Sequence, residues 1–223
     1  MTAPTAAHLV VNSRMLHFCW LPADAEAVAA MLPDGVKPLP DQPVSMNQYV
    51  VDDLAQTSGT GAYSVTYFGI DLDGSPGGAV TGPIRWWDHY LTSSPQIRSY
   101  ARSRGVPARP GVTTIDVDRG RVVAVTEVDG VPLIRTVARA GHCGDRVWRG
   151  EINYLSRFES RWVVGQYPYV MEPVDDFEVE SVEFLRPDHP VYALRPANPL
   201  ELYWGSYSPR SSFACPGGET APR

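Results

Sequence analysis

Short apolar stretches, many of them alternating with polar residues and each closed by turn residues, fill most of the chain. Stretches of this length and period predict β-strands, because a helix needs a period near 3.6 and a longer run. In chain order the predicted strands cover residues 13–20, 44–51, 63–72, 112–117, 121–128, 131–138, 146–155, 177–185, 191–194 and 202–207, and residues 84–91 form a further aromatic, partly apolar segment. Asp129-Gly130 lies between two of these runs and is a strong hairpin signal.

Two short helices interrupt the strand pattern. Asp24 can cap a helix over 25–31, which the turn residues Pro33-Asp34-Gly35 end. Pro95 suits the first turn of a second helix over 95–104, and Gly105 stops it. Many short strands with two short helices predict an α+β, mainly β fold, built on a curved, largely antiparallel sheet or barrel.

The chain shows neither an internal repeat nor a shift in composition that would mark a boundary. We therefore expect a single domain over residues 1–223. The polar start, residues 1–11, and the Pro/Gly/Ser-rich end, residues 210–223, are expected to be flexible. The six-residue turn signal at 73–78 ends the third predicted strand.

Composition narrows the possible partners. The net charge of -6 and the absence of a basic patch argue against a nucleic-acid partner. No apolar run approaches the roughly 20 residues of a membrane-spanning helix, and the first residues lack the pattern of a secretory signal. Cys19, Cys143 and Cys215 form no CxxC pair, so we expect reduced cysteines in a cytoplasmic protein.

Common catalytic signatures are missing from the sequence. It contains no GxGxxG, P-loop, GxSxG or HExxH motif, and its histidines show no ligand spacing. We expect neither a metal nor a cofactor. Lys37 is the only lysine in the chain, and it lies in a turn between a helix and a strand.

The segment Arg85-Trp86-Trp87-Asp88-His89-Tyr90 concentrates aromatic and polar side chains. On a regular strand, Trp86, Asp88 and Tyr90 would share one face, and Arg85, Trp87 and His89 the other. One face can line a pocket for a flat or unsaturated ligand, or both aromatic groups can simply pack in a core. Tyr203, in the last predicted strand, allows the same two interpretations, with a weaker indication of a pocket.

The order of several motifs resembles that of acetoacetate decarboxylase-type proteins. The strand with Arg14 is followed by a helix and by Leu32-Pro33-Asp34-Gly35-Val36-Lys37-Pro38-Leu39. Thr57-Ser58-Gly59-Thr60-Gly61-Ala62-Tyr63 is similar to the family's TSG stretch, and Ser99-Tyr100-Ala101-Arg102-Ser103-Arg104-Gly105-Val106-Pro107 to the helix of its catalytic lysine. The segments 116–122 and 202–210 fit a hairpin and the last sheet segment of the family, so the resemblance covers most of the chain.

This resemblance implies a cone-like β-barrel with flanking helices around a small-molecule cavity, in a homo-oligomer. It also implies decarboxylation of a β-keto acid through an imine on a lysine of lowered pKa. The chain departs from that chemistry, because Arg102 stands at the lysine position and Val65 or Ser64 at the position of an assisting glutamate. A guanidinium stays protonated and cannot form an imine. Of the family's site residues, only Arg14 is retained.

The remaining candidates suit a non-covalent site. Arg14 and Arg102 would together hold a carboxylate, enolate or 1,3-dicarbonyl, and Tyr63, Tyr100 or His89 would transfer a proton. Glu127 and Glu151 lie within predicted strands, either exposed on the outer face or inside the barrel. The expected catalytic residues are Arg14, Arg102, Tyr63, His89 and Glu151, and the expected substrate-binding residues are Trp86, Trp87, Tyr90, Tyr100, Glu127 and Tyr203.

The resulting hypothesis is an enzyme of bacterial specialised metabolism with a small-molecule substrate. It would act on a polyketide-like or β-dicarbonyl compound by cyclisation, dehydration or a related addition or elimination. Two alternatives stay open: a decarboxylase that works without an imine, and a non-catalytic protein that binds a small ligand.

Overall fold

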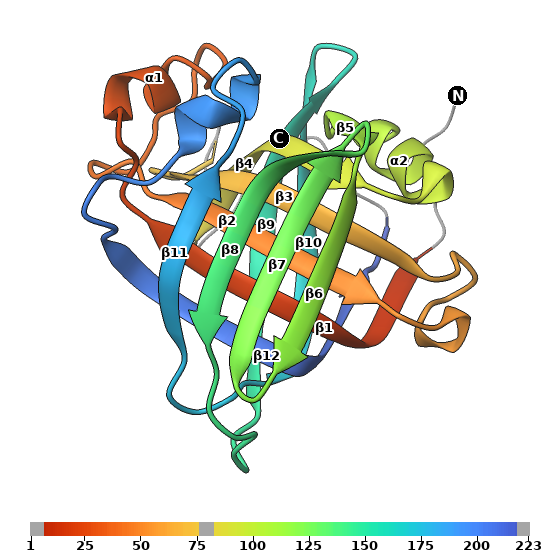
Figure 1. The fold of residues 1–223 in the computed structure, drawn as a ribbon. Coiled ribbons are helices and arrows are strands. Elements are labelled where there is room, and N and C mark those ends of the chain that lie inside the picture. Colours follow the sequence, from red (N-terminus) through yellow and green to blue (C-terminus); the bar gives the residue numbers. More distant parts are fainter. Residues whose placement is uncertain (1–6, 76–82, 218–223) are drawn as a thin grey trace.

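Seven strands close into a barrel (Figure 1). Their order around the barrel is β3-β2-β1-β12-β10-β9-β4, and β4 pairs with β3 to complete the circle. All neighbours are antiparallel except β4 and β9, which run parallel. The computed structural model describes residues 7–75 and 83–217. The barrel strands are β1 (His8–Trp20), β2 (Val44–Val51), β3 (Tyr63–Leu72), β4 (Ile84–Thr92), β9 (Trp148–Phe158), β10 (Arg161–Glu172) and β12 (Leu202–Cys215).

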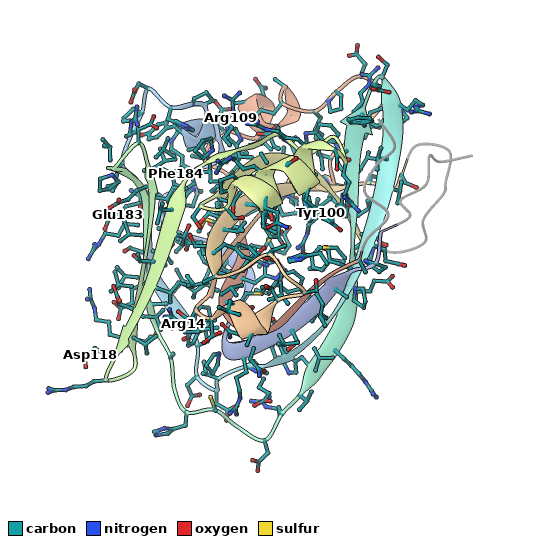
Figure 2. The ribbon with its side chains drawn as sticks, turned by 90° about the vertical axis from the view of Figure 1, so that its right-hand side faces the viewer. Arg14, Tyr100, Arg109, Asp118, Glu183 and Phe184 are labelled. Atoms are coloured by element: carbon teal, nitrogen blue, oxygen red, sulfur yellow. The ribbon has the colours of Figure 1, made fainter. Side chains whose placement is uncertain are left out.

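A second sheet crosses the outside of the barrel, in front of β1, β2 and β3 in Figure 1. Its order is β11-β8-β7-β6, from β6 (Val112–Asp118), β7 (Arg121–Val128), β8 (Val131–Arg139) and β11 (Glu178–Phe184). Figure 2 shows Phe184 on the side of this sheet that faces the barrel and Glu183 on the opposite side. The prediction of a mainly β fold with a barrel is confirmed, and the parallel pair β4–β9 is a local departure from the antiparallel pattern.

Two cores follow from this arrangement. On β1, Leu16, Phe18 and Trp20 pack with Ile115 and Leu133 of the second sheet. Met15, one residue out of phase, packs instead within the barrel. Because both faces of β1 are buried, its apolar residues form a nearly continuous run rather than an alternation.

A buried polar layer joins the barrel to the second sheet. Gln48 of β2 donates from Nε2 to the Thr126 hydroxyl at 3.0 Å, and its Oε1 accepts from Thr136 at 2.8 Å. The Thr66 hydroxyl lies 2.7 Å from that of Thr113 and 2.6 Å from that of Thr126. Because buried hydrogen-bonding groups are costly to leave without partners, this layer favours one register between the two sheets.

The two helices are short and pack on different cores: Val28 on the core between the barrel and the second sheet, and Ile97 and Ala101 on the core inside the barrel. Asp24 caps α1 (Ala25–Ala29), as predicted, and Ser94 caps α2 (Pro95–Arg102) with Pro95 in the first turn. The other short elements are η1 (Leu54–Gln56), β5 (Ala108–Pro110) and η3 (Pro190–Leu194). Gly105 follows α2 with φ +77°, and a Cβ there would lie 2.3 Å from the Arg157 carbonyl oxygen, so glycine is required.

The hairpin predicted at Asp129-Gly130 is confirmed, with φ of +55° and +73°. Strand β10 was not predicted, because Gly165 and Pro168 interrupt its apolar pattern. Pro168 is tolerated because β10 pairs with β12 only over 169–172, so Pro168 needs no partner on that side.

One predicted strand and the predictions for both chain ends need correction. Residues 191–194 belong to the 3-10 helix η3, which begins at Pro190, not to a strand. β1 begins at His8, and β12 continues to Cys215, so residues 8–11 and 210–215 are strands rather than flexible ends. Residues 8–10 pair with residues 213–215, and residues 210–213 also pair with β10, which holds both segments in the sheet. Pro209 lies at a register shift of β12. Residues 1–6 and 218–223 of the expected flexible ends, and residues 76–78 of the predicted turn, lie outside the described residues.

Candidate functional site

A small cavity lies inside the barrel beneath α2. Its volume is about 40 Å³, enough for a few water molecules or a compact ligand, and well below the roughly 300–1,000 Å³ of pockets that hold drug-sized molecules. The lining is mainly aromatic, with Tyr49, Tyr67, Trp87, Tyr90, Tyr100, Tyr154, Tyr167 and Phe213. Ile97, Ala101 and Val106, from α2 and the segment after it, close one end. Tyrosine is therefore the commonest residue around the cavity.

The strand period brings these side chains together. Residues at alternate positions share one face, so Asn47 and Tyr49 of β2 both point inward. On β4 the period is broken, because Phe68 pairs with His89 while Gly69 pairs with Trp87. The extra residue, Asp88, is a β-bulge.

Because of this bulge, the prediction of which side chains of the β4 segment share a face is wrong. Trp87 and Tyr90 both line the cavity, although a regular strand would place them on opposite faces. Trp86 packs against Trp162 on the other side of the strand. His89 also lies on that side, against Phe68.

Hydrogen-bonded hydroxyl groups surround the cavity in two sets. In the first, His8 Nε2 lies 2.8 Å from the Tyr63 hydroxyl, and the Tyr49 hydroxyl lies 3.4 Å from those of both Tyr63 and Tyr90.

In the second set, Asn47 Nδ2 donates to the Tyr67 hydroxyl at 3.0 Å. The Tyr67 hydroxyl is also hydrogen-bonded to that of Tyr167.

Burial fixes the protonation of these groups. It raises the pKa of Tyr67 to about 12 and raises the pKa of Tyr49, Tyr90 and Tyr167 as well. Burial, aided by the charge of Arg104, lowers the pKa of His8 to about 4. At neutral pH the site therefore presents protonated phenols, which can donate hydrogen bonds, beside a neutral imidazole.

Three buried polar atoms of lining residues have no hydrogen-bond partner among the described residues. They are His8 Nδ1, Asn47 Oδ1 and Trp87 Nε1. A buried polar atom without a partner costs about 1–3 kcal/mol, so the three together favour a polar ligand or water in the barrel. Such a ligand would accept from the Trp87 indole.

Arg104 supplies a buried cation at the cavity, and the sequence prediction missed it. Arg104 is 3% exposed, and its guanidinium carbon lies 3.6 Å from the centre of the Tyr100 ring. Arg102, the predicted residue, is exposed and donates to the Ala108 carbonyl oxygen at 2.7 Å. The chain leaves the helix after Arg102 and turns at Gly105, which directs Arg104 rather than Arg102 inward.

The structure does not bring Arg14 and Arg102 together. Arg14 forms an ion pair with Asp52 at 2.5 Å and donates to the carbonyl oxygen of Ile115, in the second sheet. Figure 2 shows Arg14 well apart from Tyr100, which lies on α2. Arg14 is therefore a link between β1 and β6 rather than a residue of the cavity.

The other predicted residues divide between the cavity and the rest of the molecule. Trp87, Tyr90 and Tyr100 line the cavity, and Tyr63 contacts it through His8. The remaining residues lie elsewhere. Glu151 is exposed, and Glu127 is partly exposed on β7. Tyr203 is half-exposed and hydrogen-bonded to Asp41, His89 is hydrogen-bonded to Asp88, and Trp86 packs against Trp162. The only lysine, Lys37, is exposed in the segment between α1 and β2.

A second polar centre lies elsewhere in the barrel, among residues of β1, β3 and β4. The buried Arg85 pairs with Asp71 at 2.5 Å, and its Nη1 donates to His17 Nε2 at 2.9 Å. Burial, with the charge of Arg85, lowers the pKa of His17 well below its usual value. A chamber of about 10 Å³ separates this centre from the tyrosines, and His17, Asn47, Met15 and Tyr167 are among its walls.

Among residues 7–75 and 83–217 no group of three or more His, Cys, Asp or Glu side chains is placed to bind a metal ion. In the same residues no helix is long and apolar enough to cross a membrane.

Known proteins resemble this chain in fold. No protein-family model matches it, and no curated protein matches its sequence. The acetoacetate decarboxylase of Legionella pneumophila superposes with a TM-score of 0.72 at 11% identity, over 99% of this chain and 90% of that one.

Two other solved structures are also similar in fold. The enduracididine biosynthesis enzyme MppR, complexed with pyruvate, has a TM-score of 0.67 at 13% identity over 100% and 92% of the two chains. An acetoacetate decarboxylase-like enzyme from Sphingomonas wittichii RW1 has a TM-score of 0.63 at 16% identity over 98% and 93%. The chain thus has the acetoacetate decarboxylase-like fold, which the motif order had implied.

Proposed function

We propose that this protein is an enzyme that acts on a small enolisable carbonyl compound, a keto acid or β-dicarbonyl, without forming a covalent intermediate. The observation that carries the proposal is the set of polar positions around an otherwise apolar cavity. His8 Nδ1 and Trp87 Nε1 lack protein partners there, and tyrosine hydroxyls surround the same space. A site that holds unpaired polar groups at fixed positions is arranged for a specific polar ligand.

The names of the structural neighbours support this substrate class. The MppR structure holds pyruvate, and other neighbours are acetoacetate decarboxylases. Compounds of that size suit a cavity of about 40 Å³, whereas a polyketide chain would require the tyrosine rings to move. MppR belongs to the biosynthesis of enduracididine, and we extend the proposal to a role in specialised metabolism.

Hydrogen bonds take the place of an imine in this proposal. Lys37 is exposed outside the barrel, and the cation at the cavity is Arg104, which cannot act as an amine nucleophile. Hydroxyl and guanidinium donors can instead stabilise negative charge on a carbonyl oxygen. The cavity thereby favours the enolate of its ligand.

The proposed reaction step forms this enolate. The ligand loses a proton from the carbon next to its carbonyl group, and neutral His8 accepts that proton at Nδ1. The electron pair of the broken C–H bond moves onto the carbonyl oxygen, where the Tyr67–Tyr167 pair and Arg104 stabilise it. In a β-keto acid the broken bond would be the C–C bond to the carboxylate, which leaves as carbon dioxide. The electron pair of that bond moves onto the carbonyl oxygen in the same way and gives the enolate of the shortened ketone.

The test is hydrogen exchange on pyruvate and on acetoacetate in deuterium oxide, followed by proton NMR, with carbon dioxide release measured for acetoacetate. We expect faster exchange or faster carbon dioxide release with the protein than without it, and no adduct by mass spectrometry after borohydride treatment. A borohydride-trapped adduct would contradict the non-covalent mechanism. Binding of either compound without exchange or carbon dioxide release would identify a binding protein instead.

A further inference from the structure

We infer that the buried Arg85–His17 pair is a positioning element, which acts through one water molecule on Asn47 and so directs a hydroxyl proton of the Tyr67–Tyr167 pair into the cavity. The inference rests on the proposed function, because it assigns that hydroxyl group to the ligand. Neither Arg85 nor His17 lines the main cavity, so both would act through other residues.

The tautomer of His17 follows from its partner. A guanidinium has only donors, so His17 Nε2 must accept the 2.9 Å hydrogen bond from Arg85 Nη1. Asp71 holds Arg85 by its Nε at 2.5 Å, which fixes the plane of the guanidinium. His17 is 5% exposed and neutral, so its single proton lies on Nδ1.

The small chamber connects this donor to Asn47. His17 and Asn47 are directly opposite each other on β1 and β2, and both line the chamber. Its volume of about 10 Å³ matches the roughly 10–15 Å³ that one water molecule needs. A water there can accept from His17 Nδ1 and donate to Asn47 Oδ1, which has no partner among the described residues.

This contact decides the orientation of the Asn47 amide. With Oδ1 toward the His17 side, Nδ2 must donate to the Tyr67 hydroxyl, as it does at 3.0 Å. The Tyr67–Tyr167 pair has two hydroxyl protons, and one of them forms the hydrogen bond between the two residues. Since Asn47 supplies a donor and no acceptor, the second proton stays available to a ligand in the cavity.

Two measurements test the arrangement itself, without any substrate. A crystal structure at high resolution should show a water within hydrogen-bond distance of His17 Nδ1 and Asn47 Oδ1. Nitrogen-15 NMR of the histidine rings should show His17 as the neutral Nδ1–H tautomer at pH 7. A bare Nδ1, or a chamber without water, would overturn the inference and leave the proposed function intact.

Two His17 variants test whether this arrangement affects the reaction. His17→Leu removes both ring nitrogens, and we expect the exchange rate on pyruvate to fall about 10- to 100-fold, as when a residue that orients a ligating group is lost, with little change in the Kd of pyruvate. His17→Gln keeps an acceptor for Arg85 and a donor for the water, and should restore most of the rate. A loss of rate by His17→Gln equal to that of His17→Leu, at equal stability, would contradict a positioning role.

Ser45→Ala is the matched control. Ser45 donates to Asp71 at 3.3 Å in the same polar centre, and His17 is hydrogen-bonded to Arg85 instead. We expect unchanged exchange, and a loss as large as that of His17→Leu would show that any change in the centre matters, which contradicts the inference. If the wild-type protein shows no exchange at all, the proposed function fails, while the water and the tautomer can still be judged from the crystal structure and NMR.

Discussion

Tyr67 is the side chain whose hydroxyl group connects the two polar centres of the barrel. It accepts from Asn47, is hydrogen-bonded to Tyr167, and lines the cavity. Its pKa of about 12 keeps it a donor over the whole neutral range. A phenol held in this way can stabilise an oxyanion without leaving its own hydrogen bonds unpaired.

Tyr67→Phe tests that donor. We expect the exchange rate on pyruvate to fall about 100-fold, the lower end of the loss that follows removal of one oxyanion donor. The measurement is the NMR exchange rate at saturating pyruvate. Tyr203→Phe is the matched control, because the Tyr203 hydroxyl bonds Asp41 on the surface; equal rates for the two variants would exclude Tyr67 from the reaction.

His8 makes stability depend on pH. Its pKa is lowered to about 4 in the folded protein, mainly by burial, whereas an unperturbed histidine has a pKa of 6.5. Between these values the unfolded chain binds more protons, so the free energy of unfolding decreases as pH falls from about 6.5 to 4. The decrease is on the order of 3 kcal/mol from this residue.

Urea unfolding at pH 7 and pH 4.5 measures the effect. His8→Gln removes the titrating group, so the loss of stability between the two pH values should be smaller in the variant. An identical loss in both proteins would show that His8 titrates normally.

Some residues of the cavity could be chosen from the sequence, and others could not. Trp87, Tyr90 and Tyr100 could be chosen as site residues, because aromatic residues were concentrated in two segments. Arg104 could not be separated from Arg102, since the turn at Gly105 that directs it inward depends on contact with Arg157. Tyr154 and Tyr167 lie far from Trp87 in the sequence and meet it only after β4 and β9 close the barrel.

At the scale of elements, two glycines allow tyrosine rings to lie flat across neighbouring strands. Gly165 of β10 pairs with Tyr154 of β9, and a Cβ on Gly165 would lie 2.0 Å from the Tyr154 ring. The other face of that ring stacks on Trp87 with a centroid distance of 4.1 Å. Tyr154 is thus held between a glycine and an indole, which is why β10 has a glycine in its interior.

Gly165→Ala should therefore displace the Tyr154 ring. We expect the free energy of unfolding to fall by about 1–3 kcal/mol, as in other overpacked cores, together with weaker binding of pyruvate. Urea unfolding and calorimetry measure the two effects.

Gly150→Ala is the matched control, since its Cβ would lie 2.8 Å from the Tyr169 hydroxyl oxygen, next to the small chamber rather than the main cavity. It should reduce stability without a change in pyruvate affinity. Unchanged pyruvate affinity in Gly165→Ala would show that Tyr154 does not shape the site.

Most elements could be predicted from their own residues. β2, β3 and β7 have the predicted bounds, because their apolar runs end at turn residues. β10 and the last part of β12 could not, because Gly165, Pro168 and Pro209 are tolerated only where neighbouring strands leave room or require no donor. The bulge at Asp88 depends in the same way on the pairing of β4 with β3.

At the scale of the whole molecule, the barrel and the second sheet share one core. Leu133 of the second sheet is fully buried in the cluster that also holds Phe18 and Phe68 of the barrel. The polar layer around Gln48 joins the same two layers. If the second sheet separated from the barrel, apolar surface and buried polar groups of both would be exposed to water. We therefore expect the two layers to unfold together.

Leu133→Ala tests this coupling. The free energy of unfolding should fall by about 2–5 kcal/mol, and tryptophan fluorescence and circular dichroism should still report a single, shared transition. Two separate transitions would indicate that the barrel is stable without the second sheet.

Chemical labelling follows from the position of Lys37. It is the only lysine, it is exposed, and it lies in the segment between α1 and β2 rather than in the barrel. Among the side chains, reagents that acylate amines therefore modify one known position. A dye or a surface tether can be attached there while the cavity is left free, which would allow ligand binding to be followed on single immobilised molecules.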